Sequence, residues 1–112
     1  MKIKEIGFVA IPVTDIARAR EFYEGTLLLE QSGQFMDGKW IEYGFGQDTL
    51  AIAHISDTWV PSDQGTGVAL EVEDFDAAID YLKAKDVRFA WDAFESPVCH
   101  MAIIQDPDGN KI

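Results

Sequence analysis

An internal repeat constrains the fold of this chain more than any other feature of the sequence. When the sequence is shifted by 59 positions, residues 9–15 align with residues 68–74, and four of the seven pairs are identical. In each copy an alternating segment ends at an aspartate, Asp15 or Asp74, after which apolar residues recur at helical spacing. Because aspartate is a good helix N-cap, each copy predicts a strand followed directly by a helix.

After each helix the pattern changes to the alternation of strands. The first helix is expected from about residue 15 to 24, ending at Gly25, and the second from about residue 74 to 85. Further strands are expected over residues 29–36, 40–45 and 49–55 in the first half and over residues 87–91 and 101–105 in the second. The Pro- and Gly-containing turn at residues 106–109 leads into a last strand that has barely begun at Ile112.

These elements predict an α+β fold in which two βαβββ repeats form a cupped mixed sheet. Repeat 1 covers about residues 3–55, residues 56–66 form a linker, and repeat 2 covers about residues 67–112. The length of 112 residues suits a single domain. Because each repeat alone would expose one face of its sheet, the two repeats must pair within one chain or between two chains.

Composition narrows the partners and the compartment. A formal net charge of −11 argues against nucleic acids and anionic membranes, and it favours neutral or cationic small molecules. No apolar run approaches the length of a transmembrane helix, and no apolar signal segment follows Met1. Since Cys99 is the only cysteine, no intramolecular disulfide can form, and we expect a cytoplasmic protein.

The chain resembles the vicinal-oxygen-chelate superfamily, which includes glyoxalases, bleomycin-resistance proteins and extradiol dioxygenases. The resemblance rests on residues 8–15, their echo at residues 67–74, and the closing Asp-Pro-Asp-Gly-Asn sequence at residues 106–110. The order and spacing of these motifs, which cover nearly the whole chain, agree with one another. The resemblance implies the cupped fold and a homodimer.

The resemblance also identifies positions where metal-using members hold a divalent ion. A histidine commonly precedes the first strand's apolar run, with another at the matching place in the second copy, and here these positions hold Phe8 and Gly67. A further ligand position maps to Ala51 or Ala53, and the last would fall beyond Ile112. Because none of the four mapped side chains has a lone pair to donate, we predict no metal site and no cofactor.

A few titratable side chains are candidates for catalysis. Strand alternation places His54 on the face opposite Ala51 and Ala53. Cys99 and His100 could supply an activated thiolate or atypical metal ligands, although a buried thiol and a polar edge residue are the simpler interpretation. Alternation places Glu71 on the cupped side, where it could bind a cation or act as a general base, unless it lies in solvent.

Small residues and aromatic rings predict a cleft for a small molecule. Ala10, Gly67, Ala69 and one of the pair Ala51 and Ala53 leave room on the cupped side. Rings able to line it include Tyr43, Phe45 and Phe94. The predicted ligand-binding residues are Phe8, Trp40, Ala51, Trp59, Gly67, Glu71, Trp91 and His100. Trp59, in the linker, is the ring expected to be most exposed.

Two functions follow from these observations. The first is a metal-independent protein that binds a cationic or planar small molecule in an aromatic cleft, similar to the bleomycin-resistance members. The second is an enzyme of the superfamily, a lyase, isomerase or dioxygenase, that uses atypical metal ligands or metal-free acid and base catalysis. Metal analysis and ligand screening distinguish the two.

Overall fold

The computed structural model describes all residues, Met1–Ile112, and the chain divides into two compact units. Unit 1 is Met1–Pro61 and unit 2 is Ser62–Ile112, so the boundary falls within the stretch predicted as the linker, residues 56–66. Unit 1 contains β1 (Val9–Pro12), α1 (Ile16–Arg20), a π-helical turn (Glu21–Thr26), β2 (Gln31–Phe35), a 3₁₀ turn (Met36–Gly38), β3 (Trp40–Phe45) and β4 (Asp48–Ala53). Unit 2 contains α2 (Phe75–Ala84), β5 (Arg88–Glu95) and β6 (His100–Gln105).

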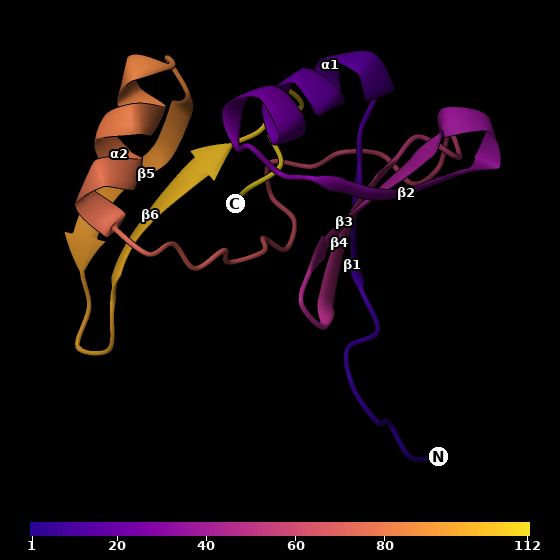
Figure 1. Cartoon of the computed structure of the whole chain (residues 1–112), viewed down its shortest axis with the longest axis horizontal. Helices are drawn as coiled ribbons and strands as arrows, with labels where there is room; N and C mark the ends of the chain where they lie inside the picture. The colour runs from indigo at the N-terminus through magenta and orange to yellow at the C-terminus, as the bar shows by residue number, and fades with distance from the viewer. The chain divides into compact units, whose positions relative to one another are not determined.

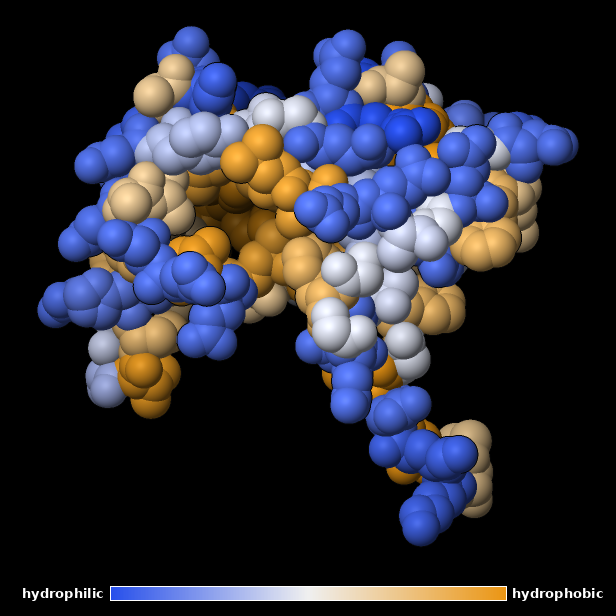
Figure 2. All heavy atoms as spheres, viewed as in Figure 1, coloured by the Kyte–Doolittle hydropathy of each residue, from blue (hydrophilic) through white to orange (hydrophobic).

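The four strands of unit 1 form one sheet in the order β1-β4-β3-β2 (Figure 1). β1 is parallel to β4, and the other neighbours are antiparallel. Every second side chain of the two central strands points toward α1 and is buried, since alternate residues of a strand face opposite sides. These buried residues are Ile41, Tyr43, Leu50 and Ile52, each 2 % exposed or less. Hydrophilic residues cover the outer surface of α1, as expected for a helix with one apolar side (Figure 2).

The first helix begins where the sequence predicts and ends later. The Asp15 carboxylate accepts a hydrogen bond of 3.0 Å from the backbone N–H of Arg18, which caps α1. The predicted end at Gly25 is wrong, because the helical path continues as the π-helical turn Glu21–Thr26. Leu28, at φ 61°, is the residue in the left-handed conformation that accompanies the change of chain direction.

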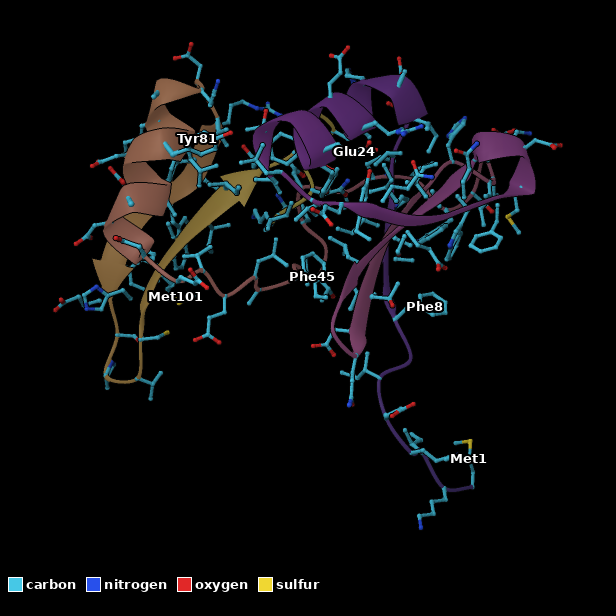
Figure 3. The ribbon with its side chains drawn as sticks, viewed as in Figure 1. Met1, Phe8, Glu24, Phe45, Tyr81 and Met101 are labelled. Carbon is cyan, nitrogen blue, oxygen red and sulfur yellow. The ribbon has the colours of Figure 1, made fainter.

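A hydrogen-bonded network joins this helical segment to the sheet (Glu24 is labelled in Figure 3). The Glu24 carboxylate accepts from Arg20 Nε at 2.6 Å and from the hydroxyl of Tyr43 at 2.8 Å. Arg20 also donates to the Gln31 side chain at 2.7 Å. Burial, with the bond to Glu24, raises the pKa of the Tyr43 phenol well above its ordinary value, so the buried hydroxyl stays a donor.

Unit 2 pairs one helix with one hairpin. The Asp74 carboxylate caps α2 by accepting from the backbone N–H of Ala77 at 3.0 Å, as predicted. The ring of Phe75 contacts the His100 ring edge to face, with centroids 5.7 Å apart, so α2 covers the His100 side of β6. β5 is longer than the predicted strand over residues 87–91, because two register shifts allow pairing with β6 to continue to Glu95.

The strand predicted to begin repeat 2, at residues 67–73, does not form. Gly67 lies beside Lys111, since a Cβ on Gly67 would lie 3.0 Å from the Lys111 carbonyl oxygen. Lys111–Ile112 pairs with β6 in unit 2, as β4 pairs with β3 in unit 1. Ile112 exchanges two backbone hydrogen bonds with Ile104. Residues 67–73 form no ladder with this segment.

The predicted turn at residues 106–109 is closed by a buried carboxylate. Asp106, 1 % exposed, accepts three hydrogen bonds of 2.9 Å, from the backbone N–H groups of Asp108 and Asn110 and from the Asn110 side-chain amide. The Asn110 amide oxygen in turn accepts from the backbone N–H of Ser62 at 3.3 Å. The turn therefore fixes both its own loop and the start of unit 2.

A groove on the open face of unit 1

The face of the unit 1 sheet that points away from α1 holds the candidate site, and we call it the open face. Trp40 and Glu42 of β3 point to this face, because they alternate with the buried Ile41 and Tyr43. Their partners in the ladder are Ala53 and Ala51 of β4. The open face therefore presents large and polar side chains on β3 beside methyl groups on β4.

Phe8 and Trp40 meet on the open face. Their rings form an edge-to-face pair with centroids 5.5 Å apart and an interplanar angle of 84°. Ala51 and Ala53 on the same face are 0 % and 1 % exposed, so the space expected at one of them is not open to solvent. Phe8 itself stays 53 % exposed and projects from the chain just before β1 (Figure 3).

Beside this pair lies an open groove of about 340 Å³ lined by Phe35, Met36, Trp40 and Glu42. The lining is apolar except for the Glu42 carboxylate, whose Oε2 accepts a 2.8 Å hydrogen bond from the Trp40 indole Nε1–H. The groove is shallow and widely open to solvent. A groove with one polar group among aromatic and thioether side chains suits a planar organic ligand.

Gly33 shapes the floor of this groove. A Cβ on Gly33 would lie 2.8 Å from the ring of Phe35 and 3.6 Å from Oε1 of Glu42. Since real Cβ atoms do not approach other heavy atoms as closely as 2.8 Å, the absence of a side chain at position 33 lets the Phe35 ring lie beside the Glu42 carboxylate. The register shift between Gln31 and Gly33 marks the same irregular point in β2.

The wall formed by Met36 belongs to a strained turn. Met36 and the following Asp37 both have φ 54°, and Gly38 has φ 81°. Only glycine adopts the left-handed region without a steric cost, so two consecutive L-residues there store strain. In this strained backbone conformation the Met36 side chain lines the groove.

Unit 2 has a separate exposed apolar patch, the hairpin patch, formed by Trp91, Phe94 and Met101. The rings of Trp91 and Phe94 lie 5.7 Å apart, and Phe94 pairs with Met101 across the ladder. Trp91 is 60 % exposed and Met101 36 %. Of the predicted ligand-binding residues in unit 2, Trp91 is therefore on an accessible apolar surface.

Other predicted binding residues lie outside the groove. The expectation that Trp59 is the most exposed ring is wrong, because Trp59 is 38 % exposed and Trp91 is 60 % exposed. Trp59 lies in a loop held by the Ser56 hydroxyl, which accepts from the Trp59 backbone N–H at 3.0 Å. Gly67 lies against the Lys111 backbone, and Glu71 is exposed in the unpaired segment before α2. None of these three residues lines the groove of unit 1.

The candidates for acid, base or thiolate chemistry have separate partners. The interpretation of Cys99 as a buried thiol is wrong, because Cys99 is exposed. Its sulfur lies 3.6 Å from the Ser96 hydroxyl. The His100 Nε2 lies 3.0 Å from a carboxylate oxygen of Glu95, and its ring contacts α2. His54 Nδ1 lies 3.0 Å from the Val13 carbonyl oxygen. The structure does not join these side chains into a nucleophile and base.

The residues present do not fit the metal of the superfamily's enzymes. Phe8, Ala51 and Gly67 have no donor atoms in their side chains. No group of three or more His, Cys, Asp or Glu side chains converges in a way that could hold a metal ion. A divalent ion needs several such donors, so we assign no chemical step to one.

With this geometry established, comparisons identify the family. Residues 5–112 match the model of the Glyoxalase/Bleomycin resistance protein/Dioxygenase superfamily, and the chain belongs to this superfamily. The resemblance seen in the sequence and the α+β fold are thereby confirmed. No curated protein matches the sequence, and none of the helices is long and apolar enough to cross a membrane.

Solved structures give more detail. The chain is similar to TnmS3, an antibiotic binding protein from Streptomyces sp. CB03234, with 25 % identity, a TM-score of 0.84, and coverage of 100 % of this chain and 94 % of that one. It is similar to a superfamily member from Sphaerobacter thermophilus DSM 20745, with 26 % identity, a TM-score of 0.80, and coverage of 97 % and 94 %. A lactoylglutathione lyase from Agrobacterium tumefaciens, at 17 % identity, a TM-score of 0.75, and coverage of 99 % and 92 %, shares the fold.

Sequence reasoning missed three of the four groove residues: Phe35, Met36 and Glu42. A signal for Glu42 was present, because it follows Trp40 by two residues in a strand that the sequence predicts with its observed bounds. Phe35 and Met36 had no such signal, since their placement depends on Gly33 and on a strained turn.

Proposed function

We propose that this protein binds a planar small molecule in the groove on the open face of unit 1, without a metal ion. The observation that carries the proposal is the lining itself, in which Trp40, Phe35 and Met36 surround one carboxylate. Binding sites for small organic molecules are mostly apolar with a few placed polar groups. An aromatic ligand stacked in the groove would contact Trp40, whose indole is already oriented by Glu42.

Two further observations support this function. The positions at which metal-using relatives would hold an ion are occupied by side chains without donors, of which Phe8 adds apolar surface beside Trp40. The similar protein TnmS3 is an antibiotic binding protein. Since Glu71, Cys99 and His100 are exposed and none of them lines the groove, we propose no catalytic role for them.

The proposal includes a homodimer located in the cytoplasm. Phe8 on the open face and Trp91 in the hairpin patch are 53 % and 60 % exposed, and such apolar surfaces in soluble proteins mark sites of ligand or partner binding. A second copy is the partner expected for a superfamily of paired repeats. The single free thiol of Cys99 suits a reducing compartment.

Ligand screening tests the function. The protein, purified with and without EDTA, is screened by thermal shift against planar aromatic compounds, because a ligand specific for the native state raises the melting temperature. We expect hits that persist in EDTA, that quench tryptophan fluorescence, and that weaken about fivefold or more in Trp40→Ala, since a stacked ring contributes about 1 kcal/mol or more.

Trp59→Ala is the matched control, because it also removes an indole, one that does not line the groove. Because Trp59 does not line the groove, the affinity of Trp59→Ala for the hits should stay within about twofold of the wild-type value. The proposal fails if no compound binds, if EDTA abolishes binding, or if Trp59→Ala weakens binding while Trp40→Ala does not.

A further inference from the structure

We infer that Glu42 makes this groove selective for planar cations that carry an N–H donor at the edge of the ring, such as protonated aminoheterocycles. The inference rests on the proposed function and names its ligand class and the residue that determines it. The Glu42 carboxylate accepts a hydrogen bond at Oε2, and its Oε1 faces Gly33.

The Trp40 indole fixes the Glu42 carboxylate. Its Nε1–H donates to Oε2 at 2.8 Å, which leaves Oε1 on the side of Gly33 and Phe35. Because Gly33 has no side chain, nothing from that residue shields Oε1. The carboxylate is therefore a fixed acceptor at the groove, oriented before a ligand arrives.

Glu42 takes no part in the ion pairs of the structure, such as those of Arg20 with Glu24 and of Lys83 with Asp92. Its side chain is nevertheless half-buried and lines an otherwise apolar groove. A half-buried carboxylate without an ion-pair partner favours a ligand that supplies a positive charge.

A ligand that covers the groove increases the difference in affinity between protonated and neutral rings. A neutral ring that stacks on Trp40 removes water from Glu42 and returns no hydrogen bond, which costs free energy. A protonated ring with an N–H at its edge returns a charge-assisted bond to Oε1, and the indole face adds a cation–π attraction. The net charge of −11 adds a favourable long-range field for a cation.

A pair of probes of matched shape tests this inference. 4-Aminoquinoline is protonated near neutral pH, whereas 1-naphthylamine has the same two-ring outline and is uncharged. We expect the wild-type protein to bind 4-aminoquinoline at least about tenfold more tightly than 1-naphthylamine, as one charge-assisted hydrogen bond supplies a factor of this size. Affinities are measured by isothermal titration calorimetry and by tryptophan quenching.

The variant Glu42→Gln keeps the size of the side chain and an acceptor for the Trp40 N–H while removing the charge. We expect it to lose the preference for 4-aminoquinoline and to bind 1-naphthylamine within about twofold of the wild-type affinity, or more tightly. Glu21→Gln, an exposed position on the π-helical turn, lowers the net charge equally and should retain the preference. Near-ultraviolet circular dichroism checks that both variants are folded.

The outcomes distinguish the inference about Glu42 from the proposed function of the groove. If both probes bind and Glu42→Gln retains the wild-type preference, the inference is overturned while the groove remains a binding site. If Glu21→Gln loses the preference as fully as Glu42→Gln, the general field and not Glu42 selects the charge, and the inference is likewise overturned. If neither probe binds the wild-type protein, the proposed function fails together with the inference.

Discussion

The ring of Phe8 meets the indole of Trp40 edge to face on the open face of unit 1, with 5.5 Å between centroids. Position 8 is where the metal-using relatives are expected to place a histidine. In this chain position 8 holds an apolar side chain, which packs against Trp40, a residue that lines the groove.

Restoring the histidine alone should not restore metal binding. Phe8→His supplies one imidazole, but Ala51 and Gly67 still provide no donor, so we expect no binding of Ni²⁺ or Zn²⁺ at micromolar concentrations by calorimetry. The double variant Phe8→His, Ala51→Glu places two donors on neighbouring strands and should bind Ni²⁺ more tightly than the single variant. Micromolar affinity in Phe8→His alone would contradict this account of the missing ligands.

The strained turn makes stability and binding change in opposite directions. Met36→Gly removes an L-residue at φ 54°, which should raise the free energy of unfolding by about 0.5–1 kcal/mol, measured by urea denaturation. It also deletes one wall of the groove, so affinity for the hits of the ligand screen should fall.

Asp37→Gly is the control for the Met36 variant. Asp37 has the same φ of 54° but does not line the groove, so its replacement should raise stability, by less because aspartate tolerates this conformation better, and leave affinity unchanged. Loss of affinity in both variants would show that the turn's backbone, and not the Met36 side chain, supports binding.

The repeat and the alternation of side chains made much of the fold predictable. Asp15 and Asp74 cap their helices as expected, and β3 has the predicted bounds. Such local signals depend on neighbours along the chain. The end of the first helix and the absence of a strand at residues 67–73 were not predicted. The helical path runs on through a π-helical turn, and residues 67–73 show that an alternating pattern alone does not form a strand.

The site was less predictable than the fold, for a related reason. Trp40 was expected as a binding residue because aromatic side chains commonly line pockets. The role of Gly33 is visible only once the Phe35 ring is placed 2.8 Å from where a Cβ would be. One of the pair Ala51 and Ala53 was expected to leave space, and both are buried in the sheet, at 0 % and 1 % exposed.

The buried turn of unit 2 gives a stability prediction. Asp106→Ala removes the acceptor of three hydrogen bonds and leaves two backbone N–H groups without their partner, which should cost about 2–4 kcal/mol in urea denaturation. Asp57→Ala, in an exposed loop, should change stability by less than about 0.5 kcal/mol. Equal effects of the two substitutions would show that the turn does not stabilise unit 2.

The network of Glu24 predicts how stability depends on pH. The hydrogen bond from Arg20, together with that from Tyr43, lowers the pKa of Glu24 below its ordinary value despite some burial. A carboxyl group with a lowered pKa in the folded protein stabilises it fully above the ordinary pKa of glutamate, about 4.3, and this stabilisation is lost as the pH falls through the lower value. The stabilisation therefore disappears in acid.

Comparison of the wild-type protein with Glu24→Gln isolates this effect, because glutamine keeps the shape and loses the titration. The wild-type protein should be more stable near neutral pH, and the difference in free energy of unfolding should shrink as the pH is lowered below about 4. Tyr43→Phe removes only the hydroxyl that donates to Glu24, so it should lower stability by about 1 kcal/mol near neutral pH and reduce the pH dependence in part. A difference between wild type and Glu24→Gln that stays constant from neutral pH into acid would mean that the ion pair with Arg20, at 2.6 Å, does not favour the charged carboxylate in the folded protein.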